Sequence, residues 1–230
     1  MPSPPAPTVN ADVAVVIPVY NEASVIAAVV QGIAPHVGRV VCVDDGSRDG
    51  SADAVATTSA DLVCHPLNMG QGAAIQTGVE FALLDPAVRW VVTFDADGQH
   101  QVDDVLRMLD VARDGGWDVV FGSRFLDHRT EVTGLKRLIL RAAVAYTNAS
   151  SGVRLTDAHN GLRVIGRDAA ALLDIRQSGM AHASEIVETV GKHRLRHTEV
   201  PVHILYTEYS RAKGQSLWNS VNILFDLLFR

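Results

Sequence analysis

Segment 94–100, which reads Phe-Asp-Ala-Asp-Gly-Gln-His, carries the strongest chemical signal in this chain. Asp95 and Asp97 are spaced i and i+2, so an extended chain places both carboxylates on the same side. Two carboxylates that lie so close repel each other unless a cation lies between them, and Gln99 adds a further oxygen. Mg²⁺ and Mn²⁺ suit such a site, because they take few protein ligands and complete their coordination with water and substrate phosphates. We therefore predict a divalent metal bound by Asp95, Asp97 and Gln99.

Two other segments could serve a bound ligand, because each follows a short apolar run. Segment 18–22 reads Pro-Val-Tyr-Asn-Glu, in which the proline is expected to end a strand and to be followed by a ring and a carboxylate. Segment 43–47 reads Val-Asp-Asp-Gly-Ser, and a carboxylate there can accept hydrogen bonds from a base ring or a ribose hydroxyl. Taken alone, the first segment also suits an ordinary strand-to-helix turn, and the second suits a helix cap.

Segment 68–72, with the sequence Asn-Met-Gly-Gln-Gly, opens an expected helix. Glycines at the start of a helix allow the backbone to approach a phosphate closely. Ile75, however, occupies the third glycine position of a dinucleotide fingerprint, and no lysine follows as in a Walker motif. The sequence therefore disfavours both the dinucleotide and the P-loop interpretations.

Basic side chains are concentrated in three later segments, at 122–124, 157–163 and 210–216. A planar guanidinium binds phosphate with two parallel hydrogen bonds. Several arginines near an acidic metal site would therefore suit a reaction in which both reactants carry phosphate. None of the nine histidines has the spacing of metal ligands, and we expect none of them to take a direct part in the chemistry.

These segments must be positioned by an α/β framework. In the first half of the chain, short runs rich in valine and isoleucine alternate with stretches of helical composition, which predicts a mostly parallel sheet flanked by helices. Ligands collect beyond the carboxyl ends of strands in such a sheet, where the acidic segments fall. Strands are expected at 13–19, 40–43, 62–64, 90–94, 119–121, 162–165 and 198–204, and helices at 23–33, 52–58, 73–84, 105–112, 136–148 and 184–192.

Composition narrows the class of protein further. The 230 residues, 47% of them hydrophobic, are enough for one domain with a sizeable core. Two cysteines are too few for a disulfide scaffold or a tetrathiolate zinc site, and a reducing cytoplasm fits them best. No apolar run is long enough to cross a bilayer, so we expect a soluble or peripheral protein.

The charge distribution is uneven along the chain. Residues 1–120 contain 5 Lys and Arg against 16 Asp and Glu, whereas residues 121–230 contain 15 against 10. The acidic half could bind a metal and the basic half could hold phosphate or rest on an anionic membrane, although a solvated surface would show the same charges.

We divide the chain into a disordered lead-in at 1–10, one domain at 11–216 with halves at 11–122 and 123–216, and a C-terminal amphipathic helix at 217–230. That helix could dock on the core or meet lipid.

Taken together and in this order, the motifs resemble those of family 2 glycosyltransferases with the GT-A fold. The likeness runs from about residue 13 to residue 216, and it is strongest to the branch of dolichol-phosphate mannose synthases and bacterial polyprenyl-phosphate sugar transferases. It implies a Rossmann-like, nucleotide-binding sheet. It also implies an inverting transfer of a sugar from a UDP- or GDP-linked donor to a polyprenyl phosphate.

The resemblance also implies a role for each matching residue. Asp95, Asp97 and Gln99 would hold Mg²⁺ or Mn²⁺ on the donor diphosphate, and segment 160–163 would lie beneath the acceptor site. Arg124 would contact the acceptor phosphate. Arg211, in Arg-x-x-Gly-x-Ser, matches a mobile-loop arginine that approaches the metal and the diphosphate, so Asp97, Arg124 and Arg211 are the residues expected to take part in catalysis. The nucleotide site would comprise Pro18, Tyr20, Glu22, Val43, Asp45, Asp95 and Ala96.

The resemblance implies a peripheral protein at the cytoplasmic face of a membrane, where the membrane surface would be a partner and nucleic acid would not. Attachment would come through the terminal helix or through a small integral membrane subunit. Leu217 stands where many mannose synthases carry lysine, and Asn160 replaces a frequent serine, so the sugar and the lipid remain open. Three alternatives stay open as well: a non-lipid acceptor, a silent nucleotide-sugar binding module, and a phosphatase of the haloacid-dehalogenase kind. The order of the acidic motifs argues against the phosphatase.

Overall fold

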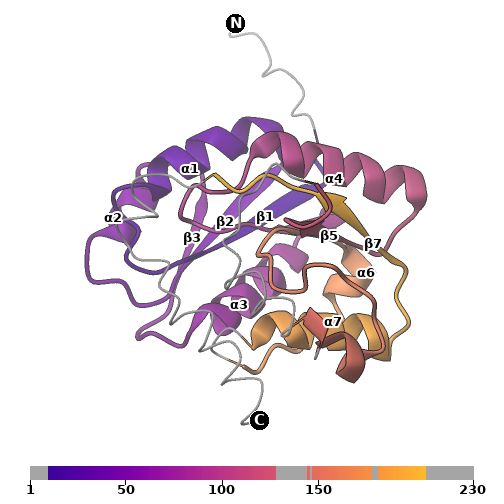
Figure 1. Cartoon of the computed structure of the whole chain (residues 1–230). Coiled ribbons are helices and arrows are strands. Elements are labelled where there is room, and N and C mark those ends of the chain that lie inside the picture. Colours follow the sequence, from indigo (N-terminus) through magenta and orange to yellow (C-terminus); the bar gives the residue numbers. More distant parts are fainter. Residues whose placement is uncertain (1–9, 128–143, 146, 178–180, 206–230) are drawn as a thin grey trace, which may run out of the picture.

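The structure is a computed structural model that describes residues 10–127, 144–145, 147–177 and 181–205 (Figure 1). The expected lead-in at 1–10 lies outside these residues except for Asn10, as do most of the expected helix at 136–148 and all of segment 210–216 and the helix at 217–230. The described elements are β1 (Val13–Val19), α1 (Ile26–Ile33), η1 (Ala34–His36), β2 (Arg39–Asp44), α2 (Ser51–Ala56), β3 (Asp61–Cys64), α3 (Gln71–Leu83), β4 (Trp90–Thr93), α4 (Val102–Gly115), β5 (Val119–Ser123), β6 (Arg163–Gly166), α6 (Arg167–Ala170), α7 (His182–Lys192) and β7 (His197–Pro201).

The strands form one sheet of seven, in the order β3-β2-β1-β4-β6-β5-β7. Only β6 runs antiparallel to its neighbours, β4 and β5, while the other pairs are parallel. The start of β6 therefore lies at the same edge of the sheet as the carboxyl ends of the other strands. The α/β fold class predicted from the sequence is confirmed.

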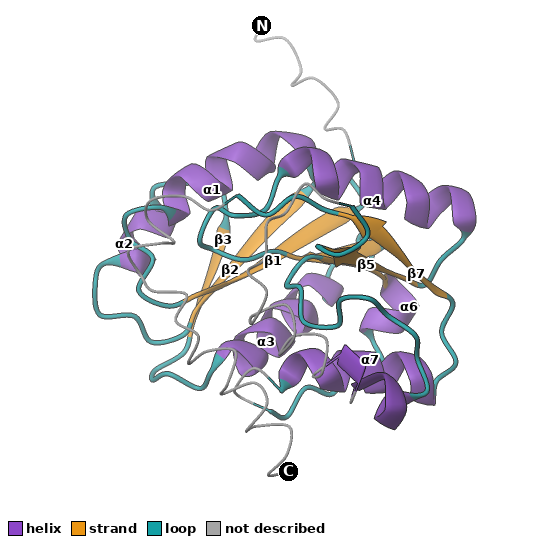
Figure 2. Cartoon of the chain, in the orientation of Figure 1, coloured by secondary structure: helices purple, strands orange, loops and turns teal. Residues whose placement is uncertain are grey.

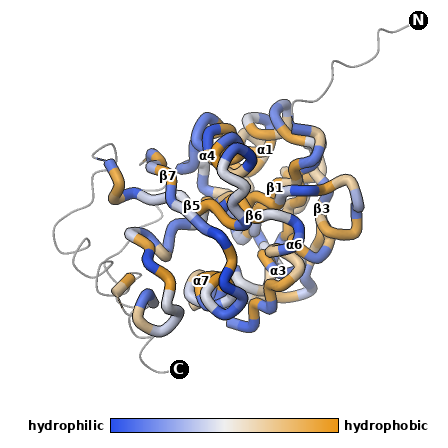
Figure 3. The backbone as a smooth tube through the Cα atoms, turned by 90° about the vertical axis from the view of Figure 1, so that its right-hand side faces the viewer, coloured by the Kyte–Doolittle hydropathy of each residue, from blue (hydrophilic) through white to orange (hydrophobic). Residues whose placement is uncertain are grey.

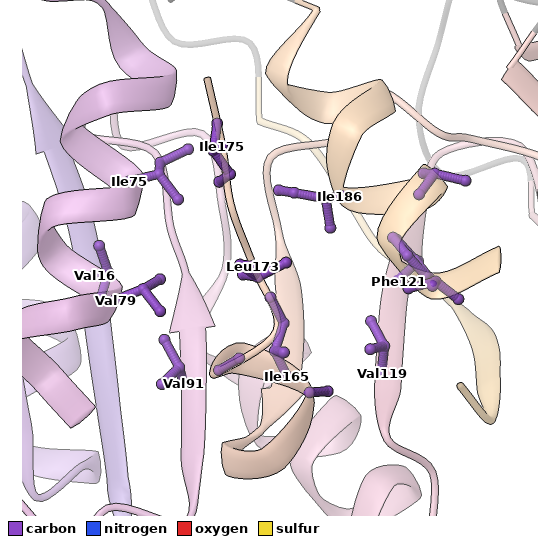
Figure 4. Close-up of a cluster of buried hydrophobic side chains, with 14 of the residues drawn as sticks. Val16, Ile75, Val79, Val91, Val119, Phe121, Ile165, Leu173, Ile175 and Ile186 are labelled. Atoms are coloured by element: carbon purple, nitrogen blue, oxygen red, sulfur yellow. The ribbon is translucent and has the colours of Figure 1, made fainter. Parts of the chain in front are cut away.

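Helices cover both faces of the sheet, with α1 and α4 on one face and α3, α6 and α7 on the other (Figure 2). Alternation along β1 explains how one strand serves both layers, since successive side chains point to opposite faces. Val13, Val15 and Ile17 pack with α1 and α4. Val16 lies on the other face, beside Val79 of α3, in the cluster that also includes Ile186 of α7 (Figure 4). Stretches of β1 and β5 in the middle of the molecule are accordingly hydrophobic (Figure 3).

β1 has the bounds predicted from the sequence, 13–19, although Pro18, which was expected to end the strand, lies one residue before its end. β1 continues to Val19, and Pro18 is in register with Val43 of β2. Pairing of β1 with β4 stops at Val16, so beyond that residue β1 has a strand on one side only. A proline lacks the backbone N–H that a central strand must donate, and this exposed edge accommodates it.

The helix expected at 23–33 begins at Ile26, because the residues before it form a turn. β7 ends at Pro201 rather than at residue 204. Two short elements, η1 and α6, were not expected from the sequence. Among the described residues, no helix is long and apolar enough to cross a membrane.

Candidate active site

The candidate site lies where the order of the strands reverses, between the carboxyl ends of β1 and β4. The chain runs from β1 outward through β2 and β3, and then returns to place β4 on the other side of β1. Such a reversal leaves a crevice between the two strand ends, and open α/β sheets bind ligands there. Tyr20 and Glu22 follow β1, and Asp95 and Asp97 follow β4, so the topology brings these predicted residues to the same edge.

Asp95 is held by hydrogen bonds from two other residues. Gln71 Nε2 donates to one carboxylate oxygen over 3.2 Å, and His100 Nε2 donates to the other over 2.9 Å. Burial raises the pKa of Asp95, but the hydrogen bond from His100 and the positive charges of Arg163 and His182 outweigh burial and bring the net pKa below its ordinary value. Asp95 is therefore a fixed carboxylate that stays ionised at neutral pH.

The pKa of Asp97 is shifted in the opposite direction from that of Asp95. Burial, the charge of Asp95 and the charge of Glu22 raise the pKa of Asp97 to about 6. Crowding of this kind fits a site for a divalent cation, because a cation would relieve the repulsion between the carboxylates. The described residues contain no group of three or more His, Cys, Asp or Glu side chains suited to a metal. By the chemistry of its oxygen ligands, the pair Asp95 and Asp97 suits Mg²⁺ or Mn²⁺, which take few protein ligands, better than zinc.

Gln99, the third predicted metal ligand, lies in the same loop. Its backbone N–H donates to Asp97 Oδ1 over 3.1 Å, and its carbonyl accepts the N–H of Leu205 over 3.0 Å. The Gln99 side chain is buried. The loop after β4 is thereby tied to the segment after β7, although the role of Gln99 as a metal ligand stays a prediction.

The turn after β1 is fixed by side chains that follow β2. Ser47 Oγ accepts the N–H of Asn21, and Ser51 Oγ accepts the N–H of Glu22 over 2.8 Å. Asp49 accepts the N–H of Ala23 over 3.0 Å. Sequence reasoning missed these contacts. They hold Glu22 in a buried position and leave the Tyr20 ring 45% exposed at the edge of the crevice.

Asp45 is fully engaged with the loop before α3. One of its carboxylate oxygens accepts the N–H of Met69 over 2.8 Å and lies 2.8 Å from His65 Nδ1, while the other accepts the N–H of Gly70 over 2.7 Å. The other ring nitrogen of His65, Nε2, lies 3.0 Å from Thr77 Oγ1. Asp45 thus uses two backbone N–H groups of segment 68–72, whose glycines are suited to close approach by a phosphate.

The side chains of the other residues predicted to bind the nucleotide could contribute little to such a site. The side chains of Val43 and Ala96 belong to the hydrophobic clusters on either face of the sheet, so only their backbone atoms could face a nucleotide. Pro18 lies within β1, one residue before its end. Arg211, predicted instead to take part in catalysis near the metal and the diphosphate, lies outside the described residues. The assignment of the nucleotide site therefore stays a prediction.

Arg124 follows β5 and makes a bidentate ion pair with Asp157. Its Nε and one terminal nitrogen donate to the two carboxylate oxygens over 2.6 Å and 2.8 Å, and its backbone N–H adds a third bond. Burial raises the pKa of Asp157, but the charge of Arg124 and its hydrogen bonds outweigh burial and lower the net pKa. The guanidinium predicted to meet a phosphate is therefore held in one orientation.

Glu199 of β7 fixes the segment that carries Asp157. Its carboxylate accepts the backbone N–H groups of Thr156 and Asp157 over 2.8 Å and 3.0 Å, and also the Thr156 hydroxyl over 2.9 Å. Nothing local in the sequence marks Glu199 as part of the site. The chain of contacts runs from β7, through the segment before β6, to Arg124.

The same segment touches the acidic side of the site at Gly161. The Cα of Gly161 lies so close to the Asp95 carboxylate that a side chain there would collide with both carboxylate oxygens. Thr93 Oγ1 donates to the carbonyl of Gly161 over 2.6 Å. Arg163, which is fully buried, donates to the carbonyls of Ala158 and Gly161 over 3.4 Å and 3.5 Å. Burial lowers the pKa of Arg163 to about 10.

Comparison with known proteins identifies the family of this chain. The family model described as glycosyl transferase family 2 matches residues 14–171. An uncharacterised protein of Methanocaldococcus jannaschii is 33% identical over 95% of this chain and 92% of its own length. The UDP-N-acetylglucosamine–dolichyl-phosphate N-acetylglucosaminyltransferase of Methanococcus voltae is 28% identical over 93% of both chains.

Among solved structures, a similar one is the glucosyl-3-phosphoglycerate synthase of Mycobacterium tuberculosis in complex with Mn²⁺, UDP and glucosyl-3-phosphoglycerate. The TM-score is 0.68 at 17% identity, covering 94% of this chain and 78% of that one. At this identity the likeness bears on the fold alone, which is that of the GT-A glycosyltransferases. Because the family 2 model matches more than half of the chain, this chain belongs to glycosyl transferase family 2.

Proposed function

We propose that this enzyme transfers a sugar, with inversion, from a nucleoside-diphosphate sugar to a polyprenyl phosphate at the cytoplasmic face of a membrane. One observation carries the proposal: segment 157–161 joins Asp95, at the acidic end of β4, to Arg124, at the end of β5. The proposed metal-diphosphate site and the proposed site for a second phosphate would thus lie at the two ends of one short segment. The dolichyl-phosphate transferase from Methanococcus voltae supports the choice of acceptor.

Asp95 and Asp97 would hold the metal, together with Gln99. Their charges and the raised pKa of Asp97, about 6, suit a divalent cation. When bound, Mg²⁺ or Mn²⁺ supplies positive charge that stabilises the departing nucleoside diphosphate. The Mn²⁺ and UDP in the glucosyl-3-phosphoglycerate synthase structure support this choice.

The acceptor needs little activation from the protein. A lipid phosphate is already ionised at neutral pH, so its oxygen can attack the anomeric carbon without a strong general base. The new bond joins that oxygen to the anomeric carbon, and the bond from the anomeric carbon to the nucleoside diphosphate breaks. The chain's task is to align the two phosphates and neutralise their charge, with Arg124 as the residue that orients the acceptor phosphate.

The membrane association is part of the proposal. We propose that the protein is peripheral and works at the bilayer surface where its acceptor resides, with a small integral membrane subunit as a partner. Co-sedimentation with anionic vesicles that contain polyprenyl phosphate tests this part, and retention in the supernatant at low salt would contradict it.

The decisive experiment measures transfer directly. Purified protein is incubated with Mn²⁺ or Mg²⁺, a polyprenyl phosphate in detergent, and labelled UDP- and GDP-sugars, and the label in the organic phase is counted. Label that disappears on chelation is the expected result. Hydrolysis of the donor or transfer to a water-soluble acceptor would instead indicate a non-lipid acceptor. Metal-dependent donor binding without any turnover, also when membranes are added, would indicate a silent binding module.

A further inference from the structure

Buried polar nitrogens without partners gather in one short stretch of the chain. Both ring nitrogens of His159, Asn160 Nδ2 and Arg163 Nε have no hydrogen-bond partner among the described residues. His159 is only 7% exposed. A buried donor left unpaired costs about 1–3 kcal/mol, so several together in a native protein call for a partner such as a bound ligand, an ion or ordered water.

His159 and Asn160 lie, along the chain, between two parts of the proposed site. At one end of the stretch, Asp157 binds Arg124, which we assign to the acceptor phosphate. At the other end, Gly161 lies against the Asp95 carboxylate, which we assign to the metal diphosphate. His159 and Asn160 are the polar residues between these two contacts, and in the transfer reaction the group between the two phosphates is the sugar.

The chemistry of these two side chains suits hydroxyl groups. Burial and the charges of Arg124, Arg163 and His182, opposed by Asp157, lower the pKa of His159 to about 4. A neutral imidazole has one donor and one acceptor, which is the pattern that matches a hydroxyl group. Asn160 keeps its own oxygen on the N–H of Leu162 over 2.9 Å, and its amide nitrogen remains as a donor.

We infer that His159 and Asn160 form the part of the site that recognises the hydroxyl groups of the transferred sugar and so selects the donor. This inference rests on the proposed function, since it takes its two reference points from the diphosphate and the acceptor phosphate. It extends that function by naming residues that distinguish one sugar from another. A site built to hydrogen-bond a hydroxyl discriminates strongly against a sugar that lacks it.

The test reads binding, so that it does not depend on turnover. Affinities of UDP, UDP-glucose, UDP-galactose, UDP-N-acetylglucosamine, GDP and GDP-mannose are measured with Mn²⁺ by calorimetry, followed by deoxy analogues of the tightest donor. The variants are His159→Phe, which keeps a ring but removes both nitrogens, and Asn160→Ser, which keeps an oxygen for the N–H of Leu162. His193→Phe, at an exposed histidine after α7, is the matched control.

In the wild type, we expect removal of one particular sugar hydroxyl to weaken binding about 10- to 100-fold. In His159→Phe that penalty should nearly vanish, while the affinity for the nucleoside diphosphate alone is unchanged. Asn160→Ser should remove the penalty for a different or neighbouring hydroxyl. If His159→Phe does not fold, as judged by circular dichroism, the same cycle with Asn160→Ser decides.

Several outcomes would overturn the inference. The variants could weaken the nucleoside diphosphate as much as its sugar conjugate, or the pattern of deoxy penalties could be the same in variants and wild type. An effect confined to the KM of the polyprenyl phosphate would assign these residues to the acceptor instead. Failure of the proposed function is distinguishable, because the wild type would then bind nucleotide sugars without transferring sugar to lipid.

Discussion

The Asp95 carboxylate lies directly against the Cα of Gly161, so that the end of β4 and the segment before β6 meet with no room for a side chain between them. Thr93, the last residue of β4, strengthens the contact by donating to the carbonyl of Gly161. The contact joins the acidic half of the chain, where the metal is proposed, to the half that carries Arg124. The position of Asp95 therefore depends on the absence of a side chain at residue 161.

Gly161→Ala should displace Asp95 and so lower activity more than stability. The added methyl group would collide with both carboxylate oxygens, and a displacement of about 1 Å at a catalytic site can lower the rate about 100-fold. We expect a fall of that size in kcat/KM, with weaker Mn²⁺-dependent binding of the nucleotide sugar. Gly32→Ala is the control, since nothing lies within 4 Å of its Cβ position. Unchanged Mn²⁺ affinity in Gly161→Ala would contradict the role assigned to this contact.

Asp97→Asn should abolish turnover and yet stabilise the metal-free protein. The folded-state pKa of Asp97, about 6, lies above the value of about 3.9 for an unfolded chain. The folded state therefore binds the extra proton between these values, and the charged carboxylate destabilises it fully above about pH 6. Thermal unfolding in chelator should show the variant more stable than the wild type at pH 8, with the difference gone near pH 4.

The exposed Asp110→Asn on α4 is the control for Asp97→Asn, and it should change neither quantity. If Asp97→Asn keeps wild-type turnover, Asp97 is not a ligand of the metal. A variant less stable than the wild type at pH 8 would contradict the electrostatic repulsion described above.

The sequence was informative where the signal is local. A run rich in valine and isoleucine predicted β1, and the apolar run before Asp95 and Asp97 placed the acidic pair at a strand end. The place of Pro18 inside β1 could not be predicted, because whether a strand tolerates proline depends on how many neighbouring strands it has at that point. That number follows from the register between β1 and β4, which no local pattern encodes.

The contacts that hold the site together join residues far apart in the chain, and these the sequence could not predict. Asp157 meets Arg124 across the sheet edge, and Glu199 reaches back to Thr156 from β7. A lone aspartate or glutamate is usually a solvated surface residue, so its type carries no information about such a partner. Only the antiparallel placement of β6 brings Asp157 to this edge.

Arg124→Ala should impair use of the acceptor more than binding of the donor. Its guanidinium is held by Asp157 in one orientation, and an arginine-to-phosphate contact adds geometry that a lysine ammonium does not supply. We expect the KM for polyprenyl phosphate to rise at least about 10-fold, corresponding to about 1.4 kcal/mol, and Arg124→Lys to restore little of it. Arg154→Ala, at an exposed arginine before the same segment, is the control. A larger change in donor affinity than in acceptor KM would reverse the assignment.

Glu199→Gln should loosen the segment between Thr156 and Gly161 without touching a substrate. The carboxylate accepts two backbone N–H groups and a hydroxyl, and hydrogen bonds to a charged acceptor contribute about 1.5–3 kcal/mol each before partial replacement by the amide. We expect a stability loss of about 1–2 kcal/mol in urea unfolding and a rise in acceptor KM. Thr156→Val closes a double-mutant cycle. Additive effects of the two changes would show that Glu199 does not act through this segment, whereas coupling in both stability and KM would show that the β7 carboxylate positions Asp157 and, through it, Arg124.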